Sequence, residues 1–182
     1  MTNPRTLDDM LAFGEAVIAR ALTHRTDPAR YITFCTISAN GPEARTVMLR
    51  RWADGVAVVQ TDAASAKIAE LEADNRAALL IWSAADDLQI RLRTRVTVQV
   101  GDAASWAKMP APARLNYGGT PAPATPMASA ESYVPGTDPN RLAILRCAAY
   151  EMEILHLGAH MHRRTLFMRA EGGAWAGHWI AP

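Results

Sequence analysis

Hydrophobic residues recur at helical spacing near the start of the chain and then follow strand-like patterns over most of its length. From Leu7 to Leu22 apolar side chains return every three or four residues, and Thr6 with Asp9 forms a capping-box pattern ahead of them. We therefore expect an amphipathic helix over about residues 7–22. Later segments alternate with period two, or are rich in β-branched and aromatic residues, which is typical of strands.

The strand-like segments are joined by short turns, such as Asn40-Gly41-Pro42 and Asp54-Gly55. Few helical segments interrupt them; a short helix is expected from Ser65 to Asn75. Consecutive hairpins with few helices favour an antiparallel β-barrel over a βαβ fold. The predicted strands cover residues 31–38, 45–52, 56–61, 77–82, 88–100, 142–147, 149–157, 165–169 and 175–181.

Two of these strands carry basic residues at alternate positions. The strand over 45–52 should place Arg45, Val47, Leu49 and Arg51 on one face. The long strand over 88–100 alternates between two sets of side chains, a length that suits a coiled strand in a barrel. The polar set is Gln89, Arg91, Arg93 and Arg95, and the opposite set is Ile90, Leu92, Thr94 and Val96.

Residues 110–140 differ from the rest, because seven of the eleven prolines lie there. We expect an extended loop rather than a second domain, so that residues 1–182 form one domain with a Pro-rich loop. Irregular loops of this length are uncommon in compact domains and often cover sites or contact partners.

Composition narrows the function classes. Nineteen basic and eighteen acidic residues give a net charge of +1, which provides no overall field for nucleic acid or an anionic membrane. No apolar run approaches the roughly 20 residues that span a bilayer, and the first residues lack a signal-peptide pattern. Cys35 and Cys147 lie in unrelated settings, which suggests two reduced thiols in a cytoplasmic protein.

A phosphate-binding group is suggested by residues from three successive elements: Arg45 on a strand, Thr61 at the end of the next strand, and then Ser65 and Lys67 at the turn into the short helix. Arginine offers a planar fork of donors, lysine a point charge, and a helix N-terminus adds unpaired N–H groups. Each residue also has a simpler interpretation. Ser65 could only cap the helix, Lys67 could only be solvated, and Arg45 could lie on an exposed strand face.

The combination of motifs is more specific than any one of them. RTVMLR at residues 45–50, Thr61 ahead of Ser65 and Lys67, LLIW at 79–82, and Gln89 occur in this order with short spacings. The chain thereby resembles the pyridoxamine 5′-phosphate oxidase-like family of FMN-binding proteins. The resemblance covers about residues 30–100 and returns at 150–182. It implies a mainly β fold with a few helices, an antiparallel Greek-key split β-barrel.

The resemblance also implies a cofactor, a set of site residues and a partner. FMN would be bound at the interface of a homodimer, and the chain would be an oxidoreductase that acts by two-electron flavin chemistry on a small substrate. By the match of HMHRR at residues 160–164, Arg164 would approach the flavin and His162 would face the substrate. The implied cofactor-binding residues are Arg45, Thr46, Val47, Met48, Leu49, Arg50, Gln60, Thr61, Ser65, Lys67, Gln89 and Arg164.

The chain also departs from the family pattern. Ala66 replaces a second phosphate-binding arginine, Leu155 an expected tryptophan, and His160 an arginine that helps to hold the pyridoxal substrate; the Pro-rich loop replaces a substrate-binding stretch. We therefore expect a divergent relative rather than the oxidase itself. A non-catalytic flavin carrier or sensor is the alternative, and a plain barrel without a cofactor is a third possibility.

Two further signals suggest other functions. His156, His160 and His162 would project to one face if they shared a strand, and that face could bind a metal. However, no cysteine lies close in the sequence, and Glu151 and Glu153 would project to the opposite face. The basic stripe of Arg91, Arg93 and Arg95 could belong to an OB-type nucleic-acid binder, but such faces normally interleave aromatic residues. We therefore expect no metal and no nucleic acid.

Overall fold

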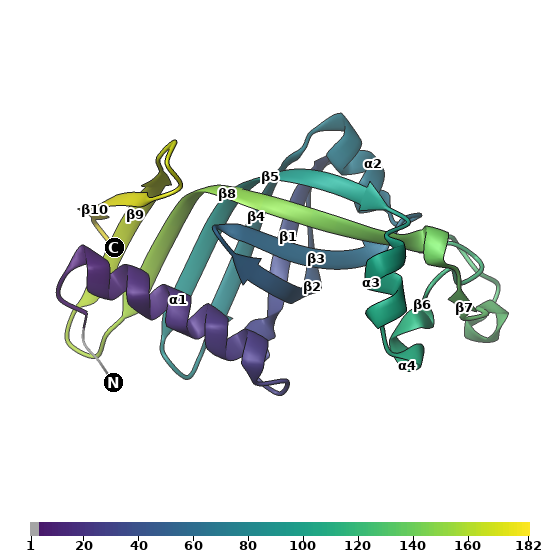
Figure 1. The fold of residues 1–182 in the computed structure, drawn as a ribbon, viewed down its shortest axis with the longest axis horizontal. Helices are drawn as coiled ribbons and strands as arrows, with labels where there is room; N and C mark the ends of the chain where they lie inside the picture. Colours follow the sequence, from purple (N-terminus) through teal and green to yellow (C-terminus); the bar gives the residue numbers. More distant parts are fainter. Residues whose placement is uncertain (1–3) are drawn as a thin grey trace.

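Six antiparallel strands close into a barrel in the computed structural model, which describes residues 4–182. The strands pair in the order β3-β2-β1-β4-β5-β8, and β8 returns to β3 (Figure 1). The predicted antiparallel split barrel is confirmed. Its strands are β1 (Tyr31–Ser38), β2 (Gly41–Ala53), β3 (Val56–Asp62), β4 (Arg76–Ser83), β5 (Leu88–Val100) and β8 (Leu142–Leu157).

The remaining elements lie around this barrel. The hairpin of β9 (His162–Arg169) and β10 (Trp175–Ile180) extends the sheet from β8 at one end of the molecule (Figure 1). At the other end lie α3 (Ala103–Lys108), α4 (Ala111–Arg114), β6 (Asn116–Tyr117) and β7 (Gly136–Thr137). The other helices are α1 (Leu7–Thr23), α2 (Ala66–Ala73) and the 3₁₀ turns η1 (Pro28–Arg30), η2 (Ala130–Ser132) and η3 (Pro139–Arg141).

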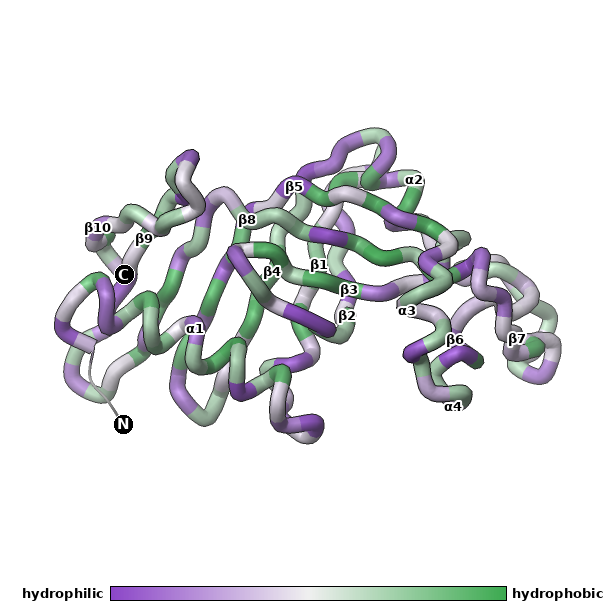
Figure 2. Tube along the Cα trace, viewed as in Figure 1, coloured by the Kyte–Doolittle hydropathy of each residue, from purple (hydrophilic) through white to green (hydrophobic). Residues whose placement is uncertain are grey.

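The hydrophobic pattern explains how these elements pack. The predicted capping box of Thr6 and Asp9 begins α1, whose buried stripe covers the barrel core. Gly14 lies on that stripe, and a Cβ there would come within 2.7 Å of Ile154 Cδ1, so the glycine permits close approach of the helix. Figure 2 shows hydrophobic stretches along the barrel strands and hydrophilic residues at many of the turns. On β5 the expected alternation is confirmed.

The strands differ from the expectation at several places. β2 begins at Gly41 instead of residue 45, and β9 begins at His162 instead of residue 165. Residues 142–147 and 149–157 form one continuous strand, because a register shift opposite Arg93 and Thr94 accommodates Tyr150 as an extra residue and bends β8 without ending it. A second register shift in β2 lies between Leu49 and Arg51. Arg51 therefore does not continue the face of Leu49 as predicted; its side chain is exposed.

The Pro-rich segment is less irregular than expected. It contains the short elements α4, β6, η2, β7 and η3, and the preceding α3 was not predicted although Asp102 caps it by accepting a hydrogen bond from the Ser105 N–H. The segment is joined to the barrel through Asp62 at the end of β3. This buried carboxylate accepts hydrogen bonds from the Gly118 N–H at 2.8 Å and from Arg141 at 2.7 and 2.8 Å.

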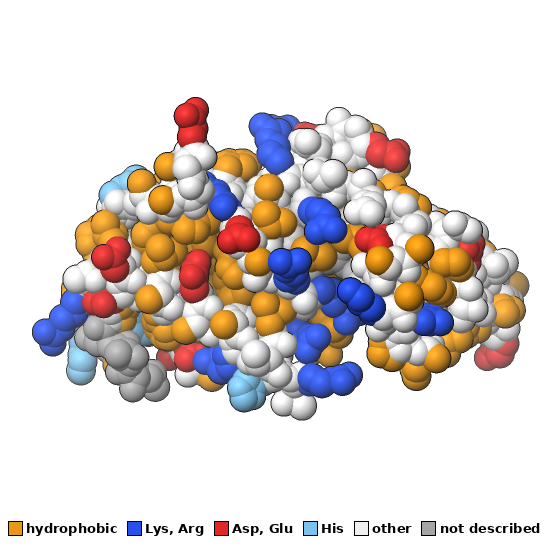
Figure 3. Space-filling view, viewed as in Figure 1, with side chains coloured by type: hydrophobic (Ala, Val, Ile, Leu, Met, Phe, Trp, Pro, Cys, Tyr) orange, Lys and Arg blue, Asp and Glu red, His pale blue; other side chains and the backbone are white. Residues whose placement is uncertain are grey.

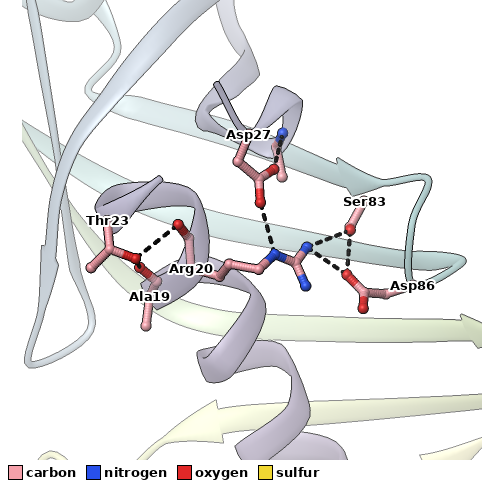
Figure 4. A network of polar contacts seen from close by, with 7 residues as sticks. Ala19, Arg20, Thr23, Asp27, Ser83 and Asp86 are labelled. Atoms are coloured by element: carbon pink, nitrogen blue, oxygen red, sulfur yellow. Dashed lines mark hydrogen bonds and ion pairs between the residues drawn. The ribbon is translucent and has the colours of Figure 1, made fainter. Parts of the chain in front are cut away.

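A polar network joins α1 to the turn that precedes β5 (Figure 4). Arg20 on α1 donates to Asp27 at 2.7 Å, to Ser83 at 3.0 Å and to Asp86 at 2.6 Å. The Arg20 guanidinium lowers the pKa of both carboxyl groups. The network thus fixes the β4–β5 turn, from which the strand carrying Gln89 begins. No helix within residues 4–182 is long and apolar enough to cross a membrane.

Candidate functional site

Two of the three predicted phosphate-binding residues, Ser65 and Lys67, meet where β3 leads into α2, together with the predicted cofactor-binding residue Thr61. The Lys67 ammonium donates to Thr61 Oγ1 at 2.9 Å and to Ser65 Oγ. Ser65 is the N-cap residue of α2, but its side chain makes no capping hydrogen bond. The interpretations that Ser65 only caps and that Lys67 is only solvated therefore do not describe this arrangement.

A cavity of about 410 Å³ opens beside this cluster. The charge of Lys67 is poorly solvated there: burial lowers the pKa of its ammonium, and Arg45 lowers it further, whereas Glu70 and Asp62 act in the opposite direction. A partly desolvated cation with hydroxyl neighbours suits an anionic ligand. The cavity is lined by Met48, Arg50, Gln60, Thr61, Asp62, Ser65, Lys67, Asn116, Tyr117 and Pro123.

Arg45 lies close to the cluster but has partners of its own. Its Nη2 donates to both carboxylate oxygens of Glu70 on α2, at 2.9 and 3.2 Å, and its Nη1 donates to Thr36 on β1. Arg45 is thus held at the α2 end of the barrel near Lys67, although it does not line the 410 Å³ cavity. It is not the solvated side chain of an exposed strand face, because its side chain is only 23% exposed.

The other residues of the RTVMLR strand are placed differently from one another. Met48 and Arg50 line the cavity, whereas the Thr46 side chain is exposed to solvent. Leu49 is in the core and Val47 packs against it, so their side chains are directed into the barrel. A ligand in the cavity could contact these two residues only through the backbone.

A second cavity, of about 300 Å³, adjoins the first, and Arg50 and Gln60 line both. Its outer wall is formed by α3, α4 and their connection, which contribute Ser105, Lys108, Met109, Pro110 and Ala113. Figure 3 shows basic side chains gathered on this face between β2 and the helices α3 and α4. The lining of the second cavity therefore combines two cations, two neutral polar residues and three apolar residues.

Gln89 and Arg164 lie on either side of Leu155 at the other end of the barrel. Both pair with Leu155 on β8, one from β5 and the other from β9, on the outer face of the sheet. Glu153, which is 8% exposed, accepts from Arg164 at 2.9 Å and from Arg91 at 3.2 Å. The Arg164 Nε is buried without a hydrogen-bond partner among the described residues, while its Nη2 pairs with Glu153.

The two groups are well separated within one chain. Thr61 pairs with Ala143 and Arg164 pairs with Leu155, so the paired positions are twelve residues apart along β8. At ~3.3 Å per residue this is roughly 40 Å measured along the strand. The structure therefore brings together the residues at the α2 end, and separately Gln89 with Arg164, but it does not bring the two groups together in one chain.

The histidines do not share a strand as the metal interpretation assumed. His156 lies in β8 and is buried against the Phe13 ring, whereas His162 begins β9 with an exposed side chain and His160 lies in the turn between the strands. Across residues 4–182 there is no group of three His, Cys, Asp or Glu side chains placed to hold a metal ion. His162 does share the outer face with Arg164, two positions along β9.

The basic stripe on β5 is largely neutralised. Arg91 pairs with Glu153, Arg93 pairs with Glu151 at 3.2 Å, and the Arg95 guanidinium lies 6.0 Å from the centre of the Tyr150 ring. Two acidic residues of the neighbouring strand β8 therefore occupy the arginines that a nucleic-acid backbone would need.

Sequence reasoning missed several residues around the first cavity. Asp62, Asn116, Tyr117 and Pro123 line it, and Glu70 holds Arg45. Burial raises the pKa of the Tyr117 hydroxyl. Asp62 had a local signal, because Asp-x-Ala-Ser before a helix is a turn pattern, but nothing in the sequence indicated that residues 116–123 fold back over β3.

Comparisons with known proteins support the fold. Residues 14–100 match the family model described as "Pyridoxamine 5′-phosphate oxidase, FMN-binding domain". A search of curated proteins finds no match. The resemblance expected from the sequence is confirmed: the chain has the split-barrel fold of pyridoxamine 5′-phosphate oxidase-like proteins, and its residues 14–100 match the model of their FMN-binding domain.

Solved structures with this fold extend over nearly the whole chain. A pyridoxamine 5′-phosphate oxidase-related, FMN-binding protein from Nostoc punctiforme is 24% identical, with a TM-score of 0.78 over 92% of this chain and 96% of that one. PhzG from Burkholderia lata, solved with tetrahydrophenazine-1-carboxylic acid, is 17% identical, with a TM-score of 0.75 over 94% of this chain and 92% of that one. General stress protein 26 from Bacillus anthracis is 14% identical, with a TM-score of 0.53 over 77% of this chain and 92% of that one.

The residues at the α2 end fit the phosphate of the cofactor that the family model implies. A phosphate dianion needs cations and several donors. Lys67, Thr61 and Ser65 supply these beside a single cavity, and Arg45 lies close to Lys67. Asp62 also lines the cavity, but Arg141 and two backbone N–H groups engage its carboxylate. The donor set is therefore compatible with FMN.

Proposed function

We propose that the chain binds FMN between two copies of itself and acts as an FMN-dependent oxidoreductase on a small anionic substrate. The observation that carries this proposal is the convergence of Lys67, Thr61 and Ser65 beside a cavity that Arg50 also lines. In this proposal Lys67, Ser65, Thr61 and Arg45 hold the phosphate. The backbone of residues 46–49 lies along the flavin.

A second copy is part of the proposal because the predicted site residues lie in two groups. Gln89 and Arg164 of one chain would approach the flavin whose phosphate is bound by Lys67 of the other chain. The aromatic side chain of Trp82, which pairs with Gln89 and is 43% exposed, supports a partner at this face. A two-fold dimer would then hold two equivalent sites.

The substrate would lie in the second cavity. Bound FMN supplies two-electron chemistry, as a hydride or its equivalent. Arg50 and Lys108 would orient an anionic group of the substrate, and Met109 with Ala113 would contact its apolar part. His162, from the second copy, would contact the substrate or hold a proton, since an imidazole is a common general acid or base.

An absorbance titration of the purified protein with FMN tests the proposal. We expect the visible flavin bands to shift and the flavin fluorescence to change with saturation at one FMN per chain. A protein that leaves both unchanged would contradict FMN binding. Reduction of the bound flavin by NAD(P)H, followed by reoxidation with an added acceptor, would support the enzyme; binding without turnover would favour the carrier or sensor.

A further inference from the structure

Glu70 is a buried carboxylate beside the cations that would bind the phosphate. Its side chain is 9% exposed, and it accepts two hydrogen bonds from Arg45 Nη2, at 2.9 and 3.2 Å. Thr36, which is itself buried, bridges the pair, because its hydroxyl donates to Glu70 and accepts from Arg45 Nη1. The guanidinium is thus held on two sides, by α2 and by β1.

The charges around Lys67 explain why an acidic residue is favourable here. Arg45 and Lys67 are two cations in a poorly solvated region, and each disfavours the charge of the other. Glu70 lies three residues after Lys67 on α2, on the same side of the helix, and it opposes the lowering of the Lys67 pKa. The carboxylate therefore allows both cations to remain charged and close together before an anion arrives.

Arg45 can be held by Glu70 and still bind a phosphate. A guanidinium has five N–H donors, and the hydrogen bonds that Arg45 makes to the described part of the chain come from Nη1 and Nη2 alone. Donors on the other edge of the fork remain. A fixed orientation also reduces the side-chain entropy that binding would otherwise cost.

We propose that Glu70 is the positioning residue of the phosphate site. By fixing the Arg45 guanidinium beside Lys67, it increases the ratio of the affinity for FMN to the affinity for riboflavin. This inference rests on the proposed FMN binding. The residue acts through Arg45 and touches no reacting atom. Its effect should therefore depend on the ligand phosphate, which riboflavin lacks.

The test compares FMN and riboflavin affinities of the full-length protein by fluorescence titration. We expect Glu70→Ala to weaken FMN binding by about tenfold, the effect of one hydrogen bond to a charged group, and to leave riboflavin binding unchanged. Glu70→Gln keeps an oxygen acceptor for Arg45 and should recover FMN binding to within about threefold of the wild type. Glu72→Ala, an exposed carboxylate on the same helix, is the matched control and should change neither affinity.

The outcomes separate this inference from the proposed function. A wild-type protein that does not bind FMN would overturn both. A second outcome would overturn only the positioning role: the wild type binds FMN, Arg45→Ala weakens this binding, and Glu70→Ala leaves the FMN affinity unchanged or raises it. Glu70 would then merely compete with the phosphate for Arg45. If Glu70→Ala does not fold, Thr36→Val decides: a loss of FMN affinity without a loss of riboflavin affinity supports the role, and unchanged FMN affinity overturns it.

Discussion

The α2 end and the β9 end of the barrel are both rich in charged side chains, but they are built differently. At the α2 end, residues from β2, β3, α2 and the Pro-rich segment surround cavities, and Lys67 contacts neighbouring hydroxyls. At the β9 end, Gln89 and Arg164 lie on the outer face of a sheet, flanking Leu155. One end is a concave site, and the other is a surface that lacks an opposite wall.

The difference suggests that each end supplies half of a site. On the sheet face, Gln89 and Arg164 need a ligand to contact. The cavity beside Lys67 has donors for the phosphate but needs ring-contacting side chains, since neither Gln89 nor Arg164 lines it. Joining the two ends through a second copy would satisfy both requirements. The following predictions test whether the two ends have these separate roles.

The largest effect is expected from Lys67→Ala. Removal of the charge-assisted hydrogen bonds to the FMN phosphate should weaken binding by about 1.5–3 kcal/mol, which is roughly tenfold to a hundredfold. Isothermal titration with FMN measures this. Lys108→Ala, which removes a cation from the neighbouring cavity only, is the control. An unchanged FMN affinity for Lys67→Ala would mean that the phosphate site is placed wrongly.

The second prediction compares the carboxylates that stabilise the two ends. Asp62→Asn weakens the attachment of Gly118 and Arg141 to β3, and we expect it to lower the free energy of unfolding by about 1–3 kcal/mol. Asp86→Asn weakens the Arg20 network at the far end and should destabilise by a similar mechanism. Urea unfolding measures both changes. Of the two variants, only Asp62→Asn should also reduce FMN affinity, because Asp62 positions residues 116–118 at the cavity; equal FMN affinities would contradict this.

The smallest effect is a pH dependence restricted to the α2 end. Because burial and Arg45 lower the Lys67 pKa, this ammonium loses its charge at a lower pH than an ordinary lysine. FMN affinity should therefore fall as the pH rises through that lowered pKa. The stability of the ligand-free protein should rise over the interval from the lowered pKa to 10.5, because the unfolded chain still binds the proton there. Lys67→Arg, which stays charged, should remove both dependences; titrations and melting curves at several pH values measure them.

Local features of the fold were predictable from the sequence. The capping box at Thr6, the Asp54-Gly55 turn with two positive φ angles, and the alternation along 88–100 are each determined by neighbouring residues. The bulges in β2 and β8 and the merging of two expected strands were not predictable, because they depend on how each strand pairs with partners far away in the sequence.

The candidate site was predictable to a similar extent. Thr61, Ser65 and Lys67 lie within seven residues, and the structure brings them together. The contribution of Tyr117 and the attachment of its segment to Asp62 depend on a long connection with no periodic pattern. The pairing of Arg45 with Glu70 could not be foreseen either, because it depends on how α2 packs on the end of the barrel.

Subunit mixing tests most directly whether the two ends form one site. Lys67→Ala and Arg164→Ala proteins should each bind FMN weakly. When they are unfolded together and refolded, mixed dimers should regain one intact site each, so that about one site in four binds FMN with wild-type affinity. If the mixture binds no better than the two variants do separately, the α2 end and the β9 end do not complete each other across two chains.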